Sequence, residues 1–335
     1  MKIALDAMGG DLAPQATLQG ALDALEKSTN KDLEIILLGD EKKMNEFLGI
    51  NIPTAFSIIN CTDEVSMHDR GSKIIKTKPD SSMVRGIELV NEKKADAFIS
   101  AGNTGAQMAA SLLILGRVKH VKRPGLAVYF QSLNGGKILC DVGANPEVKP
   151  ENLLQFAVMS SVYLEHVEGI NNPKVGLINI GAEPSKGTEL YKETHKLLSS
   201  ELTNFIGNIE ARNIFDCEAN VLVCDGFVGN TIMKFAEGSF ATFLEMIKEK
   251  IMTKNRYKIG AGMIKPALDE IRNQYDFEEH GGTPFLGVNG ISISCHGAST
   301  AKAIMNSIFL TEKSIKENLI NDISNGIDQH LGVIN

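Results

Sequence analysis

The sequence is poor in cysteine and in metal-ligand patterns. Its 335 residues include five cysteines with no Cys-x-x-Cys pair, and seven histidines that form no ligand-spaced cluster. Cys140 and Cys224 fall inside apolar runs, as is typical of reduced cysteines buried in a core. We therefore predict neither a disulfide framework nor a structural metal, and no cofactor.

Long apolar segments are also absent. The start, Met1–Asp6, contains too short an apolar run for a signal peptide. The longest uncharged stretch, Ala97–Gly116, has polar residues and glycines in its interior, which suits a buried strand and helix better than a membrane span. These absences predict a cytoplasmic protein without a transmembrane segment.

The chain lacks an excess of basic charge and several familiar catalytic motifs. Its formal net charge of −7 disfavours nucleic acid as a partner, because phosphate backbones are bound by dense Lys/Arg surfaces. The patterns GxxxxGK[ST], GxGxxG after the first strand, HExxH and GxSxG do not occur. Their absence disfavours kinases, simple dinucleotide-dependent enzymes, zincins and α/β-hydrolases.

What is present is an alternation of β-runs with helical patterns, up to a helix at about Gly105–Leu115, as in a parallel sheet. Gly125–Phe130 and Lys137–Asp141 then flank an Asn134-Gly135 step, which favours a tight hairpin and adds antiparallel pairing. We predict an α/β fold around a mixed, mostly parallel sheet, with residues 1–335 forming one unit around a central cleft.

Five of the β-runs end in a turn that combines glycine with Asp, Asn or Lys. These turns are Asp6–Asp11, Gly102–Gly105, Asp141–Asn145, Gly181–Gly187 and Asp225–Asn230. Because open α/β sheets bind ligands at the carboxyl ends of their strands, the five turns predict one shared cleft. Besides the residues discussed next, those expected to line it are Asp6, Gly9, Gly10, Asp141, Asn145 and Glu183.

The turn Gly102-Asn103-Thr104-Gly105 is the predicted phosphate site. It joins a strand to an alanine-rich helix, where the glycines let the backbone approach a ligand and the free N–H groups of the helix point at an anion. An ordinary capped turn has the same pattern.

Three side chains are candidates for chemistry, each with a structural alternative. Lys186 follows a strand and can hold a phosphate as a point charge, or it is a solvated loop lysine. Asn230 can donate to a developing oxyanion, or it caps a helix. His296 can transfer protons from a turn after the last strand, or it makes a structural hydrogen bond.

A segment over Phe240–Ile271 departs from the alternation. Two stretches with apolar residues at helical spacing flank a basic linker, Lys254–Gly260, which predicts an amphipathic helical hairpin. The apolar stripe either packs on the core or on a second subunit, or contacts a membrane surface. The residues expected to make the membrane contact are Ile259, Met263 and Ile264.

Six motifs, in this order, resemble those of the PlsX family of bacterial phosphate acyltransferases, and the similarity runs nearly end to end. They are Asp6-Ala7-Met8-Gly9-Gly10-Asp11, Asp80-Ser81-Ser82-Met83, Ser100–Ala106, Asp141–Asn145, Gly226–Asn230, and Gly287–Gly290 followed by His296-Gly297. The resemblance implies a three-layer α/β/α fold like that of isocitrate dehydrogenases and phosphotransacetylases, a homodimer, and a protruding hairpin that touches the membrane.

The resemblance also implies an activity. The family transfers a fatty acyl group from acyl-acyl carrier protein to inorganic phosphate, giving acyl-phosphate for phospholipid synthesis and for a downstream glycerol-3-phosphate acyltransferase. This chemistry needs donors for a phosphate dianion, a donor for the tetrahedral oxyanion and help for the leaving thiolate. We expect the Gly102–Gly105 turn and Lys186 to hold phosphate, Asn230 to bind the oxyanion, and His296 to orient or transfer a proton.

Two further expectations follow. Many relatives carry a second acidic residue after the first Glu of the Lys186 loop, where this chain has Pro184 and so lacks that carboxylate. Acyl carrier proteins are acidic, so the basic run Arg117–Arg123 is the predicted docking patch. The alternatives are a phosphotransacetylase-like enzyme that uses acyl-coenzyme A, and a non-catalytic, membrane-recruited scaffold that binds acyl-phosphate.

Overall fold

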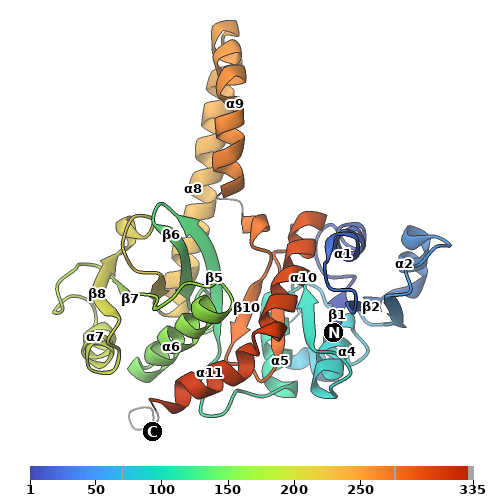
Figure 1. The fold of residues 1–335 in the computed structure, drawn as a ribbon, viewed down its shortest axis with the longest axis horizontal. Helices are drawn as coiled ribbons and strands as arrows, with labels where there is room; N and C mark the ends of the chain where they lie inside the picture. The colour runs from blue at the N-terminus through green and yellow to red at the C-terminus, as the bar shows by residue number, and fades with distance from the viewer. Residues whose placement is uncertain (70, 275–276, 331–335) are drawn as a thin grey trace.

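The computed structural model describes residues 1–69, 71–274 and 277–330, and is built on one eleven-stranded sheet in the order β3-β2-β1-β4-β11-β10-β5-β6-β9-β7-β8 (Figure 1). The strands of its first half are β1 (Lys2–Asp6), β2 (Glu34–Gly39), β3 (Phe56–Asn60), β4 (Ala97–Ser100) and β11 (Ile291–Ser294). The remaining strands are β10 (Thr283–Leu286), β5 (Gly125–Ser132), β6 (Gly135–Cys140), β9 (Val221–Val223), β7 (Val175–Asn179) and β8 (Phe205–Glu210).

Helices cover both faces of the sheet, so the fold has three layers. Those of the first half are α1 (Gln15–Lys27), α2 (Glu41–Leu48), α3 (Ile74–Thr77), α4 (Ser82–Asn91), α5 (Thr104–Ile114) and α10 (Ala301–Lys316). Those of the second half are α6 (Pro150–His166), α7 (Glu189–Glu201), the start of α8 (Gly226–Met252) and α11 (Leu319–Asp328). The rest of α8 and α9 (Asn255–Gln274) project from the sheet as a hairpin (Figure 1).

The alternation of side chains along each strand builds the two faces. In β1, Ile3 and Leu5 pack with α1 and α10, whereas Ala4 between them faces the cluster formed by α4 and α5. In the second half, α6, α7 and α11 bury one face against Ile138 and Val221, and the start of α8 covers Leu139 and Leu222 on the other. The predicted α/β class with a mixed, mostly parallel sheet is confirmed.

The predicted hairpin joins the two parallel halves. β5 and β6 pair in antiparallel fashion from Ala127 opposite Cys140 to Ser132 opposite Gly135, across the two-residue loop Leu133-Asn134. Three successive antiparallel pairings, β11 with β10, β10 with β5 and β5 with β6, separate the parallel groups. An odd number of reversals makes the two groups run in opposite directions along the sheet.

The register of the central strands brings the ends of the two groups together. Ser100 at the end of β4 pairs with Ser294, opposite Thr283 of β10, and Cys140 at the end of β6 pairs with Ala127, one residue after the Leu126 that pairs with Phe285. The turns after β4 and β6 therefore leave the sheet at nearly the same level, from opposite directions. The sequence does not predict this reversal, which is compatible with a site that several of the turns share.

The protruding hairpin also differs in its details from the prediction. α8 begins at Gly226, well before Phe240, because Asp225 caps it by accepting hydrogen bonds from the backbone N–H groups of Phe227 and Val228 at 3.0 and 2.9 Å. α9 begins at Asn255, so most of the predicted basic linker is helical. The side chain of Ile271, the end of the predicted stripe, lies outside the described part of the chain.

Candidate functional site

A groove of about 780 Å³ runs between α5 and α8 across the face of the sheet, over Leu126 of β5 and Phe285 of β10. Its α5 side consists of Thr104, Gly105, Met108, Ala109 and Leu112; the other lining residues are Arg117, Lys122, Arg123, Pro124, Val142, Gly143, Ala144, Asn145, Asn230 and Lys234. This volume falls within the range of about 300–1,000 Å³ typical of sites for organic ligands. The groove therefore has room for much more than an inorganic ion.

One end of the groove is the N-terminus of α5. Asn103 caps the helix, because its Oδ1 accepts a hydrogen bond from the Ala106 N–H at 3.0 Å. The backbone N–H groups of Thr104 and Gly105 have no partner among the described residues, and both residues line the groove. The Thr104 hydroxyl lies 3.1 Å from Ser294 Oγ on β11. Free amides at a helix N-terminus favour an anion at this end.

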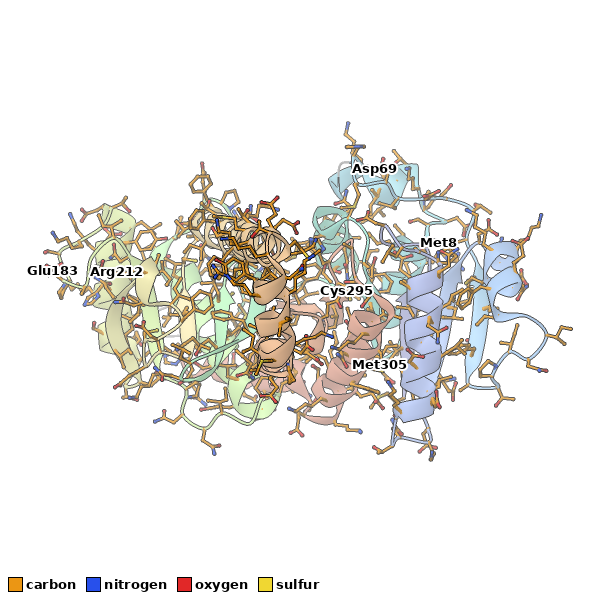
Figure 2. All side chains as sticks on the ribbon, turned by 90° about the horizontal axis from the view of Figure 1, so that it is seen from above. Met8, Asp69, Glu183, Arg212, Cys295 and Met305 are labelled. Atoms are coloured by element: carbon orange, nitrogen blue, oxygen red, sulfur yellow. The ribbon has the colours of Figure 1, made fainter. Side chains whose placement is uncertain are left out.

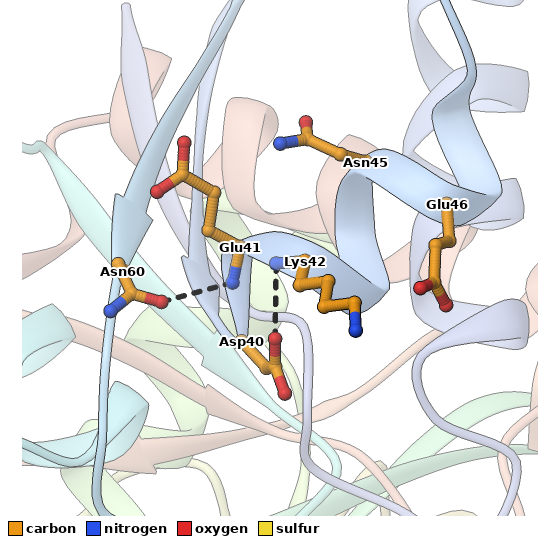
Figure 3. A pocket seen from close by; sticks show the side chains of 6 residues that line it. All are labelled: Asp40, Glu41, Lys42, Asn45, Glu46 and Asn60. Carbon is orange, nitrogen blue, oxygen red and sulfur yellow. Dashed lines mark hydrogen bonds between the residues drawn. The ribbon is translucent and has the colours of Figure 1, made fainter.

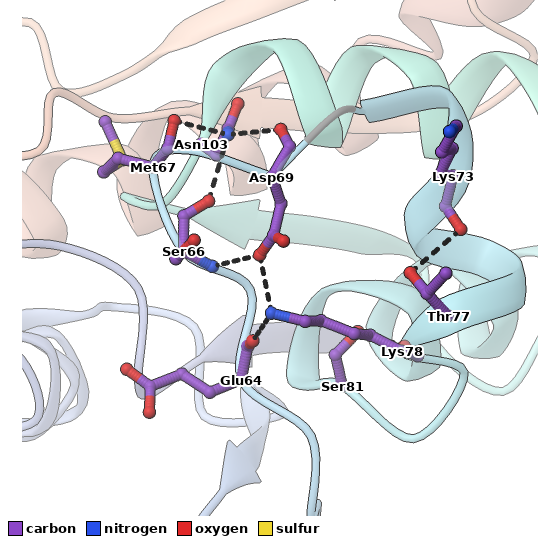
Figure 4. Close-up of polar contacts among 9 residues, drawn as sticks. All are labelled: Glu64, Ser66, Met67, Asp69, Lys73, Thr77, Lys78, Ser81 and Asn103. Carbon is purple, nitrogen blue, oxygen red and sulfur yellow. Dashed lines mark hydrogen bonds and ion pairs between the residues drawn. The ribbon is translucent and has the colours of Figure 1, made fainter.

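The side chain of Asn103, predicted to help bind phosphate, makes hydrogen bonds within the protein and does not line the groove. Its Nδ2 donates to the carbonyl oxygens of Ser66, Met67 and Asp69 at 3.1, 3.1 and 3.2 Å (Figure 4). Lys78 supports the same loop through the Glu64 carbonyl and an ion pair of 2.6 Å with Asp69, which lowers the pKa of Asp69. Asn103 thus ties a loop to the start of α5.

The turn after β6 is organised by the buried carboxylate of Asp141. Its Oδ1 accepts from the N–H groups of Leu126, Gly143 and Ala144 at 3.1, 3.2 and 3.0 Å, and its Oδ2 from that of Asn145 at 2.6 Å. Burial raises the pKa of Asp141, and these hydrogen bonds act in the opposite direction. Asp141 is thus a scaffold for the groove wall and does not itself line it.

Two glycines seat α8 on this turn. An ideal Cβ on Gly229 would lie 1.9 Å from the carbonyl oxygen of Asp141, and one on Gly226 would lie 2.8 Å from that of Asn145. Only glycine lets the helix approach so closely. The next residue, Asn230, then stands beside Gly143, with its Cβ 3.7 Å from where a Gly143 Cβ would be, and lines the groove from within α8. Asn230 is not the helix cap, which is Asp225.

The turn after β1 is a second carboxylate-centred corner outside the groove. Asp6 Oδ1 accepts from the N–H groups of Met8 and Gly9 at 3.1 and 3.0 Å, and Oδ2 accepts from the Ser100 hydroxyl at 2.7 Å. Burial raises its pKa. The Ser100 oxygen in turn accepts from the Gly102 N–H at 3.0 Å. The structure therefore places Asp6, with Gly9 and Gly10, where it braces the β4 turn from behind, and none of the three lines the groove.

Three other predicted site residues lie outside the groove. Glu183 and Lys186 are exposed on the loop after β7, where Asn208 and Asn179 donate hydrogen bonds to their carbonyl oxygens. Figure 2 shows Glu183 at one end of the molecule, with Met8 and Asp69 on the other side of the projecting hairpin. His296 is exposed, and its Nδ1 accepts from the Ala298 N–H at 3.2 Å, the structural alternative to proton transfer.

The cations of the groove come from elsewhere in the sequence. Arg117, Lys122 and Arg123 of the predicted docking patch line it, together with Lys234, one helical turn after Asn230 on α8. None of the described lining residues is acidic. The sequence signal for Lys234 is its spacing of four from Asn230, which places both side chains on one face of the helix.

A second cavity, of about 670 Å³, opens at the start of α2 (Figure 3). Its lining residues are Asp40, Glu41, Lys42, Asn45, Glu46 and Asn60. Asp40 already caps the helix through the Lys42 N–H at 3.0 Å. Its acidic lining does not suit an anion. In the described parts of the chain, no group of three or more His, Cys, Asp or Glu side chains is placed to hold a metal ion.

Many large apolar side chains of the hairpin are exposed. Ile259, Met263 and Ile264 are 68, 79 and 55% exposed. Near them at the tip, Lys254 and Arg256 lie 5.4 and 5.1 Å from the ring centre of Tyr257. Within the described residues, no helix combines the length and the apolar character needed to cross a bilayer.

Comparisons with known proteins agree with this architecture. The fold resembles that of a phosphotransacetylase from Streptococcus pyogenes, with a TM-score of 0.63, 17% identity and coverage of 95% of this chain and 94% of the other. The EutD phosphotransacetylase from Staphylococcus aureus gives a TM-score of 0.58 at 18% identity, covering 94% of each chain. At such identities the likeness defines only the class, a phosphotransacetylase-like α/β/α fold.

Sequence comparison is more specific. Residues 1–322 match the profile of a family described as "Fatty acid synthesis protein". Proteins named "Phosphate acyltransferase" from Desulfitobacterium hafniense (strain DSM 10664 / DCB-2) and Alkaliphilus oremlandii (strain OhILAs) are 48 and 45% identical to the chain. These alignments cover 96 and 98% of this chain, and 96 and 97% of the relatives. The chain belongs to this family of phosphate acyltransferase enzymes.

The double role of Asn103 can be separated by two substitutions. Asn103→Asp keeps the oxygen that caps α5 but loses the three donor hydrogen bonds, whereas Asn103→Ala loses both. We expect faster hydrogen exchange of residues 64–69 in both variants, and faster exchange in the first turn of α5 only in Asn103→Ala, with about 1 kcal/mol lost from the cap. If residues 64–69 exchange at the wild-type rate in Asn103→Asp, the three hydrogen bonds from Asn103 do not hold this loop in place.

Proposed function

We propose that the enzyme transfers a fatty acyl group from the thioester of an acyl carrier protein to inorganic phosphate, producing acyl-phosphate that a downstream glycerol-3-phosphate acyltransferase consumes. The observation that carries the proposal is the groove between α5 and α8 in a member of this family. It joins free amides at a helix N-terminus to an amide side chain, Asn230, along a partly apolar wall. The free amides suit phosphate, the Asn230 amide suits a thioester carbonyl, and the apolar wall suits the start of an acyl chain.

The chemistry needs no covalent intermediate on the protein. A phosphate oxygen attacks the thioester carbonyl carbon, forming the C–O bond; the tetrahedral intermediate then breaks its C–S bond, and the proton of hydrogen phosphate passes to the departing thiolate. In the proposed arrangement the Thr104 and Gly105 amides hold the phosphate. The Asn230 amide donates to the oxyanion, where charge develops in the transition state. Both groups act mainly by positioning and electrostatics.

The cation that completes the phosphate site has two candidates. Lys234 lines the groove four residues after Asn230 on the same helix. Lys186, the residue predicted from the sequence, lies on an exposed loop outside the groove lining. We propose Lys234 as the cation of the phosphate site. The variants Lys186→Ala and Lys234→Ala decide between the two residues, because loss of the true cation should raise the KM for phosphate. His296 keeps its proposed proton-transfer role only if His296→Ala changes the pH dependence of kcat.

The function is tested by incubating the purified protein with acyl-acyl carrier protein and phosphate and detecting acyl-phosphate. Asn230→Ala should lower kcat by about 10²–10³ with little change in the KM for phosphate, because its partner is the thioester oxygen. The control is Glu237→Ala, because Glu237 is an exposed residue of the same helix that does not line the groove. A folded Asn230→Ala variant that keeps more than about a third of wild-type kcat would remove Asn230 from the mechanism.

Two other functions remain distinguishable by the same assay. The phosphotransacetylase-like fold fits an enzyme that uses acyl-coenzyme A, in which case coenzyme A thioesters would replace the carrier-protein substrate at equal or higher kcat/KM. A membrane-recruited scaffold that binds acyl-phosphate without catalysis would produce no acyl-phosphate from either thioester.

We further propose that the α8–α9 hairpin brings the enzyme to the membrane surface, and that the enzyme is a homodimer in the cytoplasm. The exposed apolar side chains near a cationic tip support the first proposal, since such a combination favours an anionic lipid surface. A second copy of the chain is the other partner that could cover the apolar stripe.

The membrane proposal predicts that replacing Ile259, Met263 and Ile264 together by Gln abolishes co-sedimentation with anionic liposomes, because each buried apolar side chain contributes about 1.5–3 kcal/mol. Turnover of soluble acyl-acyl carrier protein should be largely retained. Leu133→Gln, which changes an apolar residue that is 73% exposed on the β5–β6 loop, is the control. If the triple variant still co-sediments with liposomes as the wild type does, but changes from dimer to monomer, these side chains contact a second subunit and not the membrane.

A further inference from the structure

The end of the groove away from the start of α5 is basic. We call Arg117, Lys122 and Arg123 the basic end; all three are exposed and line the groove. No acidic residue accompanies them among the described lining residues, in a chain whose formal net charge is −7. Positive charge is therefore concentrated locally, which favours an anionic ligand group at this end.

The basic end is held in place by a buried side chain. Gln155 of α6 is fully buried; its Oε1 accepts from the Lys122 N–H and its Nε2 donates to the His120 carbonyl, both at 2.8 Å. The Arg117 guanidinium donates to the Lys122 carbonyl at 2.6 Å. Buried Val118 and Val121 anchor the same loop in the core. The backbone that carries these cations is thus preorganised, as a binding site requires.

The same loop is linked to the catalytic wall of the groove. The Asn145 side chain donates from Nδ2 to the carbonyl of Pro124, directly after Arg123, at 2.7 Å, and to Asp141 Oδ2 at 2.9 Å. Asp141 also supports the turn on which α8 and Asn230 are seated. The basic end and Asn230 are therefore fixed relative to one another through a chain of buried hydrogen bonds.

One inorganic phosphate cannot use both ends of the groove. Thr104 and Leu112 are eight positions apart in α5, which is about 12 Å at the 1.5 Å rise of an α-helix. Met108, Ala109 and Leu112 form an uncharged wall along that length, and Arg117 follows beyond it. The lining therefore suits a ligand with a less polar middle and an anionic group at the far end, in addition to phosphate at the start of α5.

We propose that the basic end binds the phosphate ester of the 4′-phosphopantetheine arm that carries the acyl thioester. The proposal rests on the proposed function, because that function supplies a thioester donor with such an arm. The arm lies along α5, so that the thioester at its tip reaches the region between Asn230 and the free amides of Thr104 and Gly105. The cations of the basic end contact this one phosphate group inside the groove. This contact is separate from any long-range attraction between the basic end and an acidic carrier protein.

The test compares two small thioester donors that differ only in this phosphate, acyl-4′-phosphopantetheine and acyl-pantetheine. For the wild-type enzyme, kcat/KM should be at least about tenfold higher with the phosphorylated donor, the value of one charge-assisted hydrogen bond. In the double variant Lys122→Gln, Arg123→Gln this preference should fall to about twofold or less. Lys119→Gln, in the same loop but outside the groove lining, should keep the wild-type preference.

The results that would overturn this proposal differ from those that would overturn the proposed function. An unchanged preference in the double variant, or an equal loss in Lys119→Gln, would show that the basic end makes no specific contact. If the double variant has a higher KM for inorganic phosphate than the wild type with both donors, the basic end binds inorganic phosphate and not the donor's phosphate ester. If the wild-type enzyme produces no acyl-phosphate from any thioester, the proposed function fails; calorimetric binding of 4′-phosphopantetheine that is lost in the double variant would still support the site itself.

Discussion

The close contact between α8 and the turn after β6 is the constraint on which the groove depends. A Cβ on Gly229 would lie 1.9 Å from the Asp141 carbonyl oxygen, so the helix rests directly on the backbone of the turn. Asp225 caps the helix at its start and accepts a hydrogen bond of 2.6 Å from the Tyr191 hydroxyl. The position of Asn230 is fixed by this contact and cannot be adjusted by side-chain rotation alone. Since a displacement of about 1 Å can cost 10² in rate, this contact matters for function.

Two buried carboxylates support the two walls of the fold in the same manner. Asp6 behind the β4 turn and Asp141 beneath the groove wall each accept several hydrogen bonds from backbone N–H groups or a hydroxyl. Burial raises the pKa of both, because keeping a charged carboxylate away from water costs free energy. The donors offset that cost and leave each turn with a single arrangement. Both residues therefore position the site without lining it.

The sequence predicts the parts of this fold that depend on local chemistry. The Asn134-Gly135 step identifies the β5–β6 hairpin, and the alternation of strands and helices identifies the parallel halves. It does not predict that three antiparallel pairings reverse the second half, because strand order depends on long-range packing. Asn103 shows the same limit at one residue. Its capping role is local, whereas its three hydrogen bonds to the Ser66–Asp69 loop join segments more than thirty residues apart.

The most direct measurement is of acyl-phosphate formation by Gly229→Ala compared with Gly238→Ala, two single-methyl changes in α8. At Gly238 nothing lies within 4 Å of the new methyl group, so activity should match that of the wild type. At Gly229 the methyl group must push the helix off the Asp141 turn, and kcat should fall by about 10² in a protein that remains folded by circular dichroism. Wild-type kcat in a folded Gly229→Ala variant would contradict the claim that this contact positions the site.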